Sequence, residues 1–240
     1  MPLVQTVTQV QVDGSSATSF NLTVTSAGNG NTLVWLGAIF DLNETWTTGT
    51  FTDTGNTWTT REGEAAKTGQ KTRSYVIWAT GITGGTRTLT IPLTGTSGEG
   101  GRYVIYGCLE FSGLHTTAAE DTWDQNSNID YTTNDVTAGP ITTTDAGDVL
   151  VGAASLLSGD PTLNWASPTS WTNSYRENDT SDHENIDAGY WIPGSIQTTY
   201  SAQWTHDNTS GTRGCAVVVA LKPAAPDQHN PFVKVLFKPA

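Results

Sequence analysis

Cationic side chains are scarce in this chain. It has 11 Lys and Arg against 23 Asp and Glu in 240 residues, which gives a net charge of −12. Because nucleic-acid binding depends on cationic side chains that contact phosphates, this balance argues against a nucleic-acid partner and against anionic membrane surfaces. No apolar run approaches the length of a membrane span. Residues 1–12 lack the basic leader and the apolar block of a signal peptide, so we expect a protein made and assembled in the cytoplasm.

Cysteine is almost absent, with two residues in the whole chain. Cys108 and Cys215 each lie in an apolar run. Their spacing matches no metal-binding motif. We favour two buried thiols that pack as small hydrophobic side chains, and a disulfide between them is the alternative.

The common catalytic motifs are also missing. The sequence has no nucleophile elbow, no zinc-protease motif and no phosphate loop. All the histidines fall in predicted loops or in the tail: His115, His183, His206 and His229. A pair of carboxylates can hydrolyse glycosides, and Glu62 with Glu64, or Glu110, are the first candidates. No spacing supports such a pair, so we expect a non-enzymatic protein that needs no cofactor.

Threonine and glycine are abundant, whereas Leu, Met, Lys and Glu are scarce, and this composition favours strand over helix. No stretch shows a sustained apolar period of 3.6 residues, so we expect almost no helix. Short apolar runs alternate with Gly-rich turns at near-regular spacing. The sequence therefore predicts an all-β fold, a sandwich or a barrel, and we favour an antiparallel β-sandwich.

Tryptophan spacing indicates an internal repeat. Trp58 and Trp78 lie 20 residues apart, as do Trp171 and Trp191, and a shift of 113 relates the two pairs. The apolar runs that flank the pairs fall in step with them: Leu33–Phe40 and Val149–Leu157 before, and Tyr103–Phe111 and Cys215–Leu221 after. We therefore predict one sandwich domain over residues 1–222 that contains two copies of a β unit, about 31–114 and 147–222. The copies would share one core in a pseudo-twofold arrangement, with residues 112–147 as a long connection.

The last part of the chain, residues 223–240, differs in composition. Its proline-rich beginning, 223–231, predicts a semi-rigid extended spacer. A strand-like segment, 232–238, follows, and three of the five lysines lie between Lys222 and Lys238. The segment is either a final strand of its own sandwich or an arm that adds a strand to a neighbouring subunit or partner, and we favour the arm. Its contact residues would be Phe232, Val233, Lys234, Val235, Leu236, Phe237 and Lys238.

The nine tryptophans fall into two groups. Six lie in or beside predicted strands and are expected to pack in the core: Trp35, Trp58, Trp78, Trp171, Trp191 and Trp204. The other three, Trp46, Trp123 and Trp165, fall in predicted loops. We favour these three as caps over the ends of the sandwich, and the alternative is that they are platforms for sugar rings.

Carboxylates gather in two segments, and such loops can bind calcium. The first cluster contains Glu120, Asp121, Asp124, Asp130 and Asp135, and the second contains Glu177, Asp179, Asp182, Glu184 and Asp187. Neither has the alternating aspartates and central glycine of a dedicated calcium loop. We therefore favour a solvated acidic face and expect no metal.

Four short segments resemble a class of β-sandwich domains that recur in virion proteins of tailed bacteriophages and in bacterial surface proteins. They are residues 31–35 (Asn-Thr-Leu-Val-Trp), 55–59 (Gly-Asn-Thr-Trp-Thr), 110–114 (Glu-Phe-Ser-Gly-Leu) and 148–152 (Asp-Val-Leu-Val-Gly). The resemblance covers most of residues 31–222, and its motifs are strand starts, turns and core tryptophans. It implies a jelly-roll or lectin-like sandwich and no catalytic residue.

The resemblance and the basic, proline-spaced tail together imply a role in assembly. We expect a non-enzymatic virion protein, a capsid decoration or cement protein whose partner is the major capsid protein or another virion protein. A homotrimer would present six similar β units to a quasi-sixfold lattice. The alternative is a carbohydrate- or receptor-binding module of a phage tail or fibre, and a weaker third is a glycoside-acting enzyme.

Overall fold

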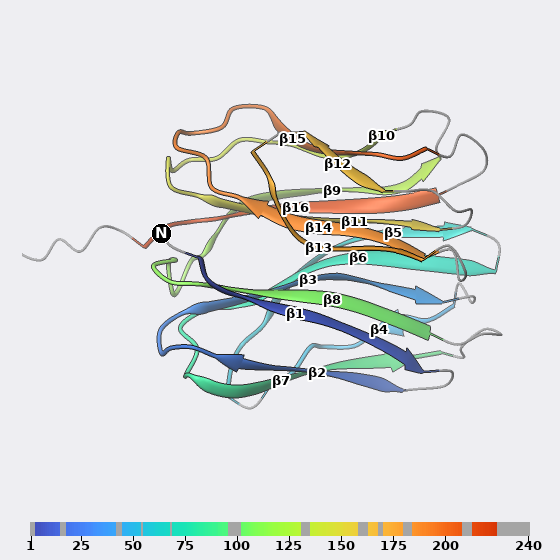
Figure 1. The fold of residues 1–240 in the computed structure, drawn as a ribbon, viewed down its shortest axis with the longest axis horizontal. Coiled ribbons are helices and arrows are strands. Elements are labelled where there is room, and N and C mark those ends of the chain that lie inside the picture. Colours follow the sequence, from blue (N-terminus) through green and yellow to red (C-terminus); the bar gives the residue numbers. More distant parts are fainter. Residues whose placement is uncertain are drawn as a thin grey trace, which may run out of the picture.

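The described part of the chain folds into β-strands joined by turns. A computed structural model describes residues 3–14, 18–41, 45–53, 55–67, 69–95, 102–130, 135–157, 163–167, 170–179, 184–207 and 213–224. These residues form sixteen strands and no helix, which confirms the predicted all-β fold (Figure 1). No helix in the described ranges could span a membrane. The predicted arm, 232–238, lies outside the described residues.

The first eight strands form one unit of two facing sheets. The strands are β1 (Leu3–Gly14), β2 (Ser19–Ser26), β3 (Thr32–Asp41), β4 (Thr47–Thr48), β5 (Thr59–Lys67), β6 (Gln70–Ala79), β7 (Gly85–Thr94) and β8 (Arg102–Phe111). The inner sheet has the order β1-β8-β3-β6-β5, and the outer sheet has the order β2-β7-β4. All neighbouring strands are antiparallel.

The remaining eight strands form a second unit with the same connectivity. The strands are β9 (Glu120–Asp130), β10 (Asp135–Ile141), β11 (Val149–Leu157), β12 (Asn164–Ser167), β13 (Thr172–Asp179), β14 (Glu184–Trp191), β15 (Tyr200–Thr205) and β16 (Arg213–Leu221). The inner sheet reads β9-β16-β11-β14-β13 and the outer sheet reads β10-β15-β12. Adding eight to each strand number of the first unit gives the second unit strand by strand.

The paired tryptophans occupy matching places in the two units. Trp58 directly precedes β5, and Trp171 directly precedes the matching strand β13. Trp78 and Trp191 lie at the ends of the matching strands β6 and β14. The structural match is longer than the predicted one. It includes β1 and β2 in the first unit, and β9 and β10 in the second.

The expectation of a long connection over residues 112–147 is wrong, because β9 and β10 lie there. The sequence of β9, Glu-Asp-Thr-Trp-Asp-Gln-Asn-Ser-Asn-Ile-Asp, is polar except for Trp123 and Ile129. It forms the edge of its inner sheet, pairing only with β16 in that sheet. An edge strand tolerates such polar side chains, which otherwise read as a loop.

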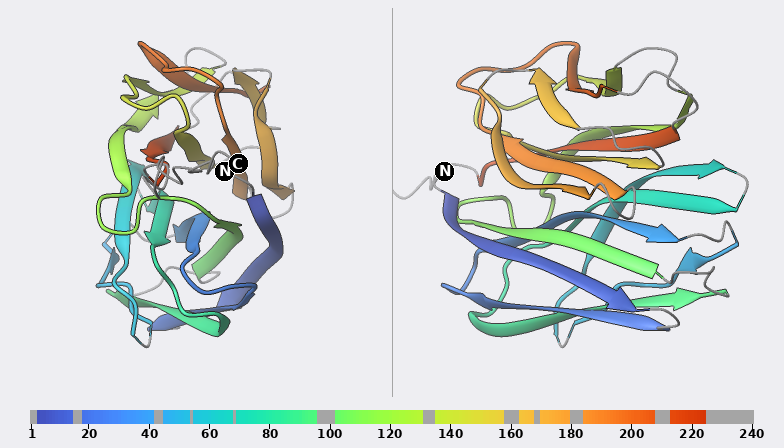
Figure 2. Two further views of the ribbon diagram at one scale, coloured as in Figure 1. Left: turned by 90° about the vertical axis from the view of Figure 1, so that its left-hand side faces the viewer. Right: turned by 45° about the vertical axis from the view of Figure 1, so that its right-hand side comes forward.

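The two units pack through their inner sheets, so the molecule has four layers (Figures 1 and 2). β1 and β8 contact β13, β3 contacts β14 and β11, β6 contacts β11 and β16, and β5 contacts β16 and β9. Edge strand β1 therefore lies over edge strand β13, and edge strand β5 lies over edge strand β9. Because β1 matches β9 and β5 matches β13, the two units are related by an approximate twofold axis. The expectation of two sheets around a single shared core is wrong. The described residues form four sheets with three hydrophobic cores between them.

Burial on both faces explains the continuous apolar runs of the central strands. Every residue of β3 is buried. Alternate side chains enter different cores: Leu33, Trp35 and Ile39 enter the core of the first unit, and Val34, Leu36 and Phe40 enter the core between the inner sheets. Because successive side chains in a strand point to opposite faces, a strand that is covered on both sides needs apolar residues throughout.

A buried polar seam crosses the interface between the inner sheets. The Ser155 hydroxyl on β11 lies 2.9 Å from that of Thr72 and 2.8 Å from that of Ser74, both on β6. Ser74 also donates to the backbone carbonyl of Cys215 at 3.1 Å. Since buried hydroxyls must be hydrogen-bonded, these contacts favour one register between the two units.

Both thiols are free and buried, as predicted, so no disulfide forms. Cys215 lies in the polar seam beside Ser74 and Ser155, and Cys108 lies in the core of the first unit. Burial raises the pKa of both thiols, which keeps them protonated and unreactive.

Gly63 on β5 lies where the inner sheets approach each other closely. A Cβ atom at this position would lie 2.7 Å from the carbonyl oxygen of Ala216 on β16 and 3.1 Å from that of Asn126 on β9. Backbone atoms cannot swing aside as a flexible side chain can, so a methyl group here would force the sheets apart.

We predict that Gly63→Ala lowers the free energy of unfolding by about 1–3 kcal/mol in urea denaturation, because it overpacks a closed interface. Gly194→Ala is the matched control, because a Cβ atom there would meet nothing within 4 Å. Equal stability of the two variants would contradict the close approach of the inner sheets.

Candidate functional site

An open groove of about 470 Å³ lies along the outer face of β5. It is lined by Thr48, Gly49, Thr50, Phe51, Trp58, Thr60 and Glu62. The groove exists because the outer sheet has three strands and the inner sheet has five. On the side of the inner sheet, the described core between them draws on β3, β6 and β8, and no side chain of β5 belongs to it.

Strand alternation places the groove residues. Thr60, Glu62 and Glu64 share the outer face of β5, whereas Gly63 and Ala65 are buried on the inner face. In the register of the two strands, β6 places Arg73 opposite Glu64, Tyr75 opposite Glu62, and Lys71 opposite Ala66. β5 and β6 thus build a row of alternating charges at the edge of the groove.

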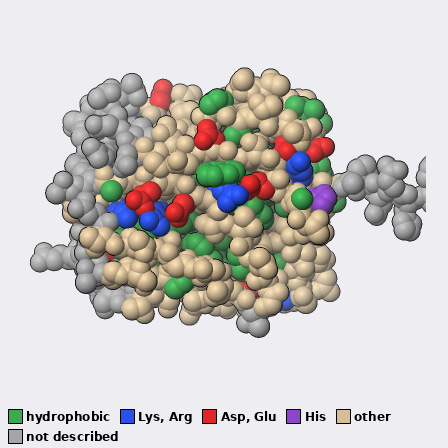
Figure 3. Space-filling view, turned by 180° about the vertical axis from the view of Figure 1, so that it is seen from behind, with side chains coloured by type: hydrophobic (Ala, Val, Ile, Leu, Met, Phe, Trp, Pro, Cys, Tyr) green, Lys and Arg blue, Asp and Glu red, His purple; other side chains and the backbone are tan. Residues whose placement is uncertain are grey.

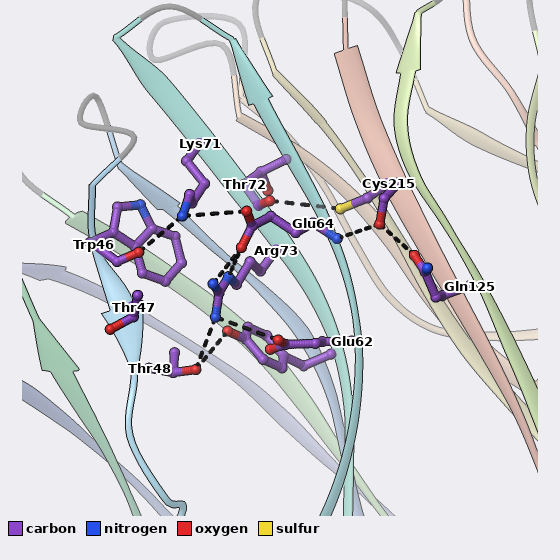
Figure 4. Close-up of polar contacts among 12 residues, drawn as sticks. Trp46, Thr47, Thr48, Glu62, Glu64, Lys71, Thr72, Arg73, Gln125 and Cys215 are labelled. Carbon is purple, nitrogen blue, oxygen red and sulfur yellow. Dashed lines mark hydrogen bonds and ion pairs between the residues drawn. The ribbon is translucent and has the colours of Figure 1, made fainter.

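Arg73 on β6 is the centre of this charged cluster (Figure 4). It pairs with Glu64, lies 3.5 Å from Glu62, and donates a hydrogen bond to the Thr48 hydroxyl at 3.2 Å. Burial by itself lowers the pKa of Arg73. Its neighbours Tyr75 and Glu62 outweigh this effect and raise the pKa above its ordinary value, so the guanidinium stays charged. The cluster therefore holds Glu62 at the groove in one position.

Lys71 completes the cluster on the side away from the groove. Its ammonium lies 3.4 Å from Glu64 and donates to the backbone carbonyl of Trp46 at 3.0 Å. The Trp46 ring is contacted by both cations, with Lys71 Nζ 5.5 Å and the Arg73 guanidinium carbon 5.2 Å from the ring centroid.

Figure 3 shows that charged side chains on one face of the molecule gather in a few clusters of both signs on an otherwise uncharged surface.

The alternative that Trp46 is a surface platform is wrong. Its side chain is fully buried in the core of the first unit. The reason is tertiary: Lys71 and Arg73 cover the indole ring, and both come from a strand about 25 residues further along the chain. Sequence reasoning could not place these cations over a residue in a predicted loop.

The other two candidate platforms lie on strands. Trp123 is on β9 and is 39% exposed, with the Arg61 guanidinium carbon 4.8 Å from its ring centroid. Arg61 also forms an ion pair with Glu120 at 2.9 Å, which links β5 to β9. Trp165 is on β12, and its side chain lies outside the described residues.

Trp58 is the functional candidate that the sequence did not reveal. It was expected in the core; the structure packs it against the core of the first unit and leaves it half-buried at the groove. The matched Trp171 of the second unit is only 8% exposed. The available signal was local: Trp58 follows the turn at Asp53–Asn56 and is flanked by threonines.

Glu110, a candidate for glycoside hydrolysis, is committed to the fold. It is fully buried and accepts hydrogen bonds from the Ser26 hydroxyl at 2.8 Å, the Ala27 amide at 2.9 Å and the Asn31 side chain at 2.6 Å. Burial alone raises the pKa of Glu110, but these hydrogen bonds lower it below its ordinary value. The carboxylate fixes the turn between β2 and β3. Glu62 and Glu64, the other candidates, are held by Arg73.

The acidic clusters form no metal centre in the described ranges, where no three His, Cys, Asp or Glu side chains are grouped to hold an ion. Glu120 pairs with Arg61, and Asp187 pairs with Arg176 at 2.6 Å. Asp135 is exposed. The side chains of Asp130, Glu177, Asp179 and Glu184, and residue Asp182, lie outside the described set.

One carboxyl pair is unusual. Asp121 accepts hydrogen bonds from the amide and hydroxyl of Thr144 at 2.5 and 2.6 Å and pairs with Lys222 at 3.0 Å. Although burial raises the pKa of Asp121, these contacts lower it below its usual value. Asp148 is fully buried beside it, and burial and the proximity of Asp121 raise the pKa of Asp148 to about 7.

We predict that the wild-type protein loses stability as the pH is raised, and that the Asp148→Asn variant lacks this loss. The folded pKa of Asp148, about 7, exceeds the value of about 3.9 expected in the unfolded chain. The folded state therefore binds more protons between these values, and stability falls as the pH rises through this window by roughly 1–3 kcal/mol. Urea denaturation at pH 5 and pH 8 measures it. Asp135→Asn, at an exposed carboxylate, is the control and should keep the wild-type slope; an Asp148→Asn variant with that slope would disprove the assignment.

Comparisons of the chain with protein-family models, with curated proteins and with solved structures found no match. The candidate site is therefore defined by its own geometry. It is an open groove with an aromatic wall, several hydroxyl groups and a carboxylate fixed by an arginine.

Proposed function

We propose that this chain is a non-enzymatic structural protein of a virus particle, a capsid decoration or cement protein that binds coat subunits. The observation that carries the proposal is the repeated connectivity of the two units and their fusion through the inner sheets. A protein that bridges coat subunits needs a rigid body and repeated surfaces more than it needs a reactive centre. Made in the host cytoplasm, it would reside on the virion.

The strand order supports a jelly-roll type for each unit. In the first unit β1, β3, β6 and β8 belong to the inner sheet, and β2, β4 and β7 belong to the outer sheet. Successive strands thus alternate between facing sheets, with β5 as the exception beside β6. Jelly rolls recur in viral capsid proteins and in lectin domains. We infer that duplication of one such unit produced the chain.

The use of buried polar groups also supports a structural role. Glu110 fixes a turn, Asp187 pairs with Arg176, and the hydroxyls of the polar seam bind one another. These groups serve to hold the fold together. The net charge of −12 favours solubility of the free protein before assembly.

The proposed arm would leave the body from a fixed point. The Ala224 amide donates to the Gly113 carbonyl at 2.8 Å, and Pro223 bridges to Leu114. Lys222 is held on both sides, by Ala119 and by His115. The chain is thus anchored at the link between the two units. From there residues 232–238 would reach a neighbouring subunit or coat protein, in a homotrimer or on the particle.

We predict that a variant ending at Ala225 folds normally but loses assembly and particle binding, because every described strand is retained and the arm is removed. Circular dichroism checks the fold, light scattering checks the oligomer, and mass spectrometry of purified particles measures stoichiometric recovery. The full-length Gly194→Ala variant is the control and should be recovered at wild-type levels. Normal recovery of the truncated chain would disprove the arm hypothesis. Absence of the full-length chain from particles would disprove the virion role.

A second function is favoured by one observation. The open groove with Trp58 is the kind of surface that a carbohydrate- or receptor-binding module of a tail or fibre presents. It is compatible with a structural role on the particle.

A further inference from the structure

The groove on the outer face of β5 combines a rigid aromatic wall with polar groups of defined direction. Trp58 is half-buried at its edge, and Phe51 is 7% exposed beside it. The Phe51 ring meets the Tyr75 ring edge-on, with centroids 5.6 Å apart. An aromatic surface that is locked by packing from behind can bind the apolar face of a flat ligand without a large loss of entropy.

Thr48 supplies a donor to the groove. Its hydroxyl oxygen accepts hydrogen bonds from Arg73 at 3.2 Å and from the Tyr75 hydroxyl at 3.3 Å. Because a hydroxyl has one hydrogen and two lone pairs, both lone pairs are occupied and the hydrogen remains available to donate. Burial raises the pKa of Tyr75 far above its ordinary value, so its own hydrogen stays in place.

Glu62 supplies acceptors. Its carboxylate lies 3.5 Å from Arg73, so the two form an ion pair that is longer than a direct hydrogen bond. The side chain is 39% exposed at the groove. A carboxylate has about four lone-pair sites, and it can accept two hydroxyl groups from a ligand. The hydroxyls of Thr50 and Thr60 add weaker contacts along the same wall.

The charge at the groove selects the ligand. The nearby cations already form ion pairs: Arg73 pairs with Glu62 and Glu64, and Lys71 pairs with Glu64. With Glu62 facing the groove and a net charge of −12, an anionic ligand would be repelled. A pyranose ring with neutral substituents fits: its C–H face covers an indole, and its hydroxyls both donate and accept.

We propose that this groove is a binding site for a neutral pyranose of a glycan, with Trp58 as the platform, Glu62 as hydroxyl acceptor and Thr48 as donor. The repeat does not require the opening, since the matched Trp171 is buried. The site does not rest on the virion role. A chain that is recovered on particles but binds no sugar refutes this site alone.

The test is calorimetric titration of the full chain with methyl glycosides of glucose, galactose, mannose and N-acetylglucosamine and with their short oligomers. At least one should bind saturably and shift the Trp58 indole resonance in proton–nitrogen spectra. Trp58→Ala should weaken binding by about tenfold or more, and Glu62→Gln should weaken it less, because the neutral amide keeps one acceptor. Thr50→Arg should block the groove while leaving the core intact, because Thr50 is exposed.

Trp123→Ala is the matched control, since Trp123 is an exposed tryptophan away from the groove, and it should bind like the wild type. Circular dichroism verifies that each variant is folded. The site is overturned if none of these sugars binds, if folded Trp58→Ala and Thr50→Arg retain wild-type affinity, or if Trp123→Ala abolishes binding.

Discussion

The packing of the two inner sheets against each other is the constraint on which the rest of the molecule depends. Each inner sheet is apolar on both faces, so neither unit can leave its inner face in water without exposing a large hydrophobic surface. The contact is tight enough to require glycine at Gly63 and polar enough to join Ser74 to Ser155. The hydrophobic core supplies the stability of the interface, and the hydroxyl seam favours one alignment.

The same arrangement explains where a ligand can bind. Inner faces are closed by the other unit, and most of each outer face is closed by a smaller sheet. The outer face of β5 extends past that cover, and the charged cluster around Arg73 keeps it ordered. The groove therefore follows from the difference between a five-stranded inner sheet and a three-stranded outer sheet. Both proposed functions use the same rigid body.

Much of the fold could be predicted from the sequence, because strand propensity, turn residues and apolar period are local properties. Trp58 and Trp171, whose spacing suggested a repeat, directly precede β5 and β13. The run Leu33–Phe40 carried the signal of a strand that is buried on both faces. What the spacing could not supply was the number of layers, because two units with identical patterns fit one shared core or several equally well.

The candidate site was harder to predict than the fold. The exposure of an aromatic side chain depends on which distant strand covers it: Lys71 and Arg73 bury Trp46, whereas the only local signal at Trp58 was the preceding turn and its flanking threonines. Polar edge strands are similarly invisible, because β9 has the composition of a loop. These features arise from tertiary contacts that local patterns do not encode.

Equilibrium unfolding of the intact chain tests the central claim, that the inner-sheet interface joins two matched units into one cooperative body. Tryptophan fluorescence and far-ultraviolet circular dichroism would follow the same urea titration, with calorimetry as the thermal counterpart. The account predicts coincident transitions and equal calorimetric and van't Hoff enthalpies, because neither unit can keep its inner face dry alone. Two separate transitions, one for each unit, would contradict it.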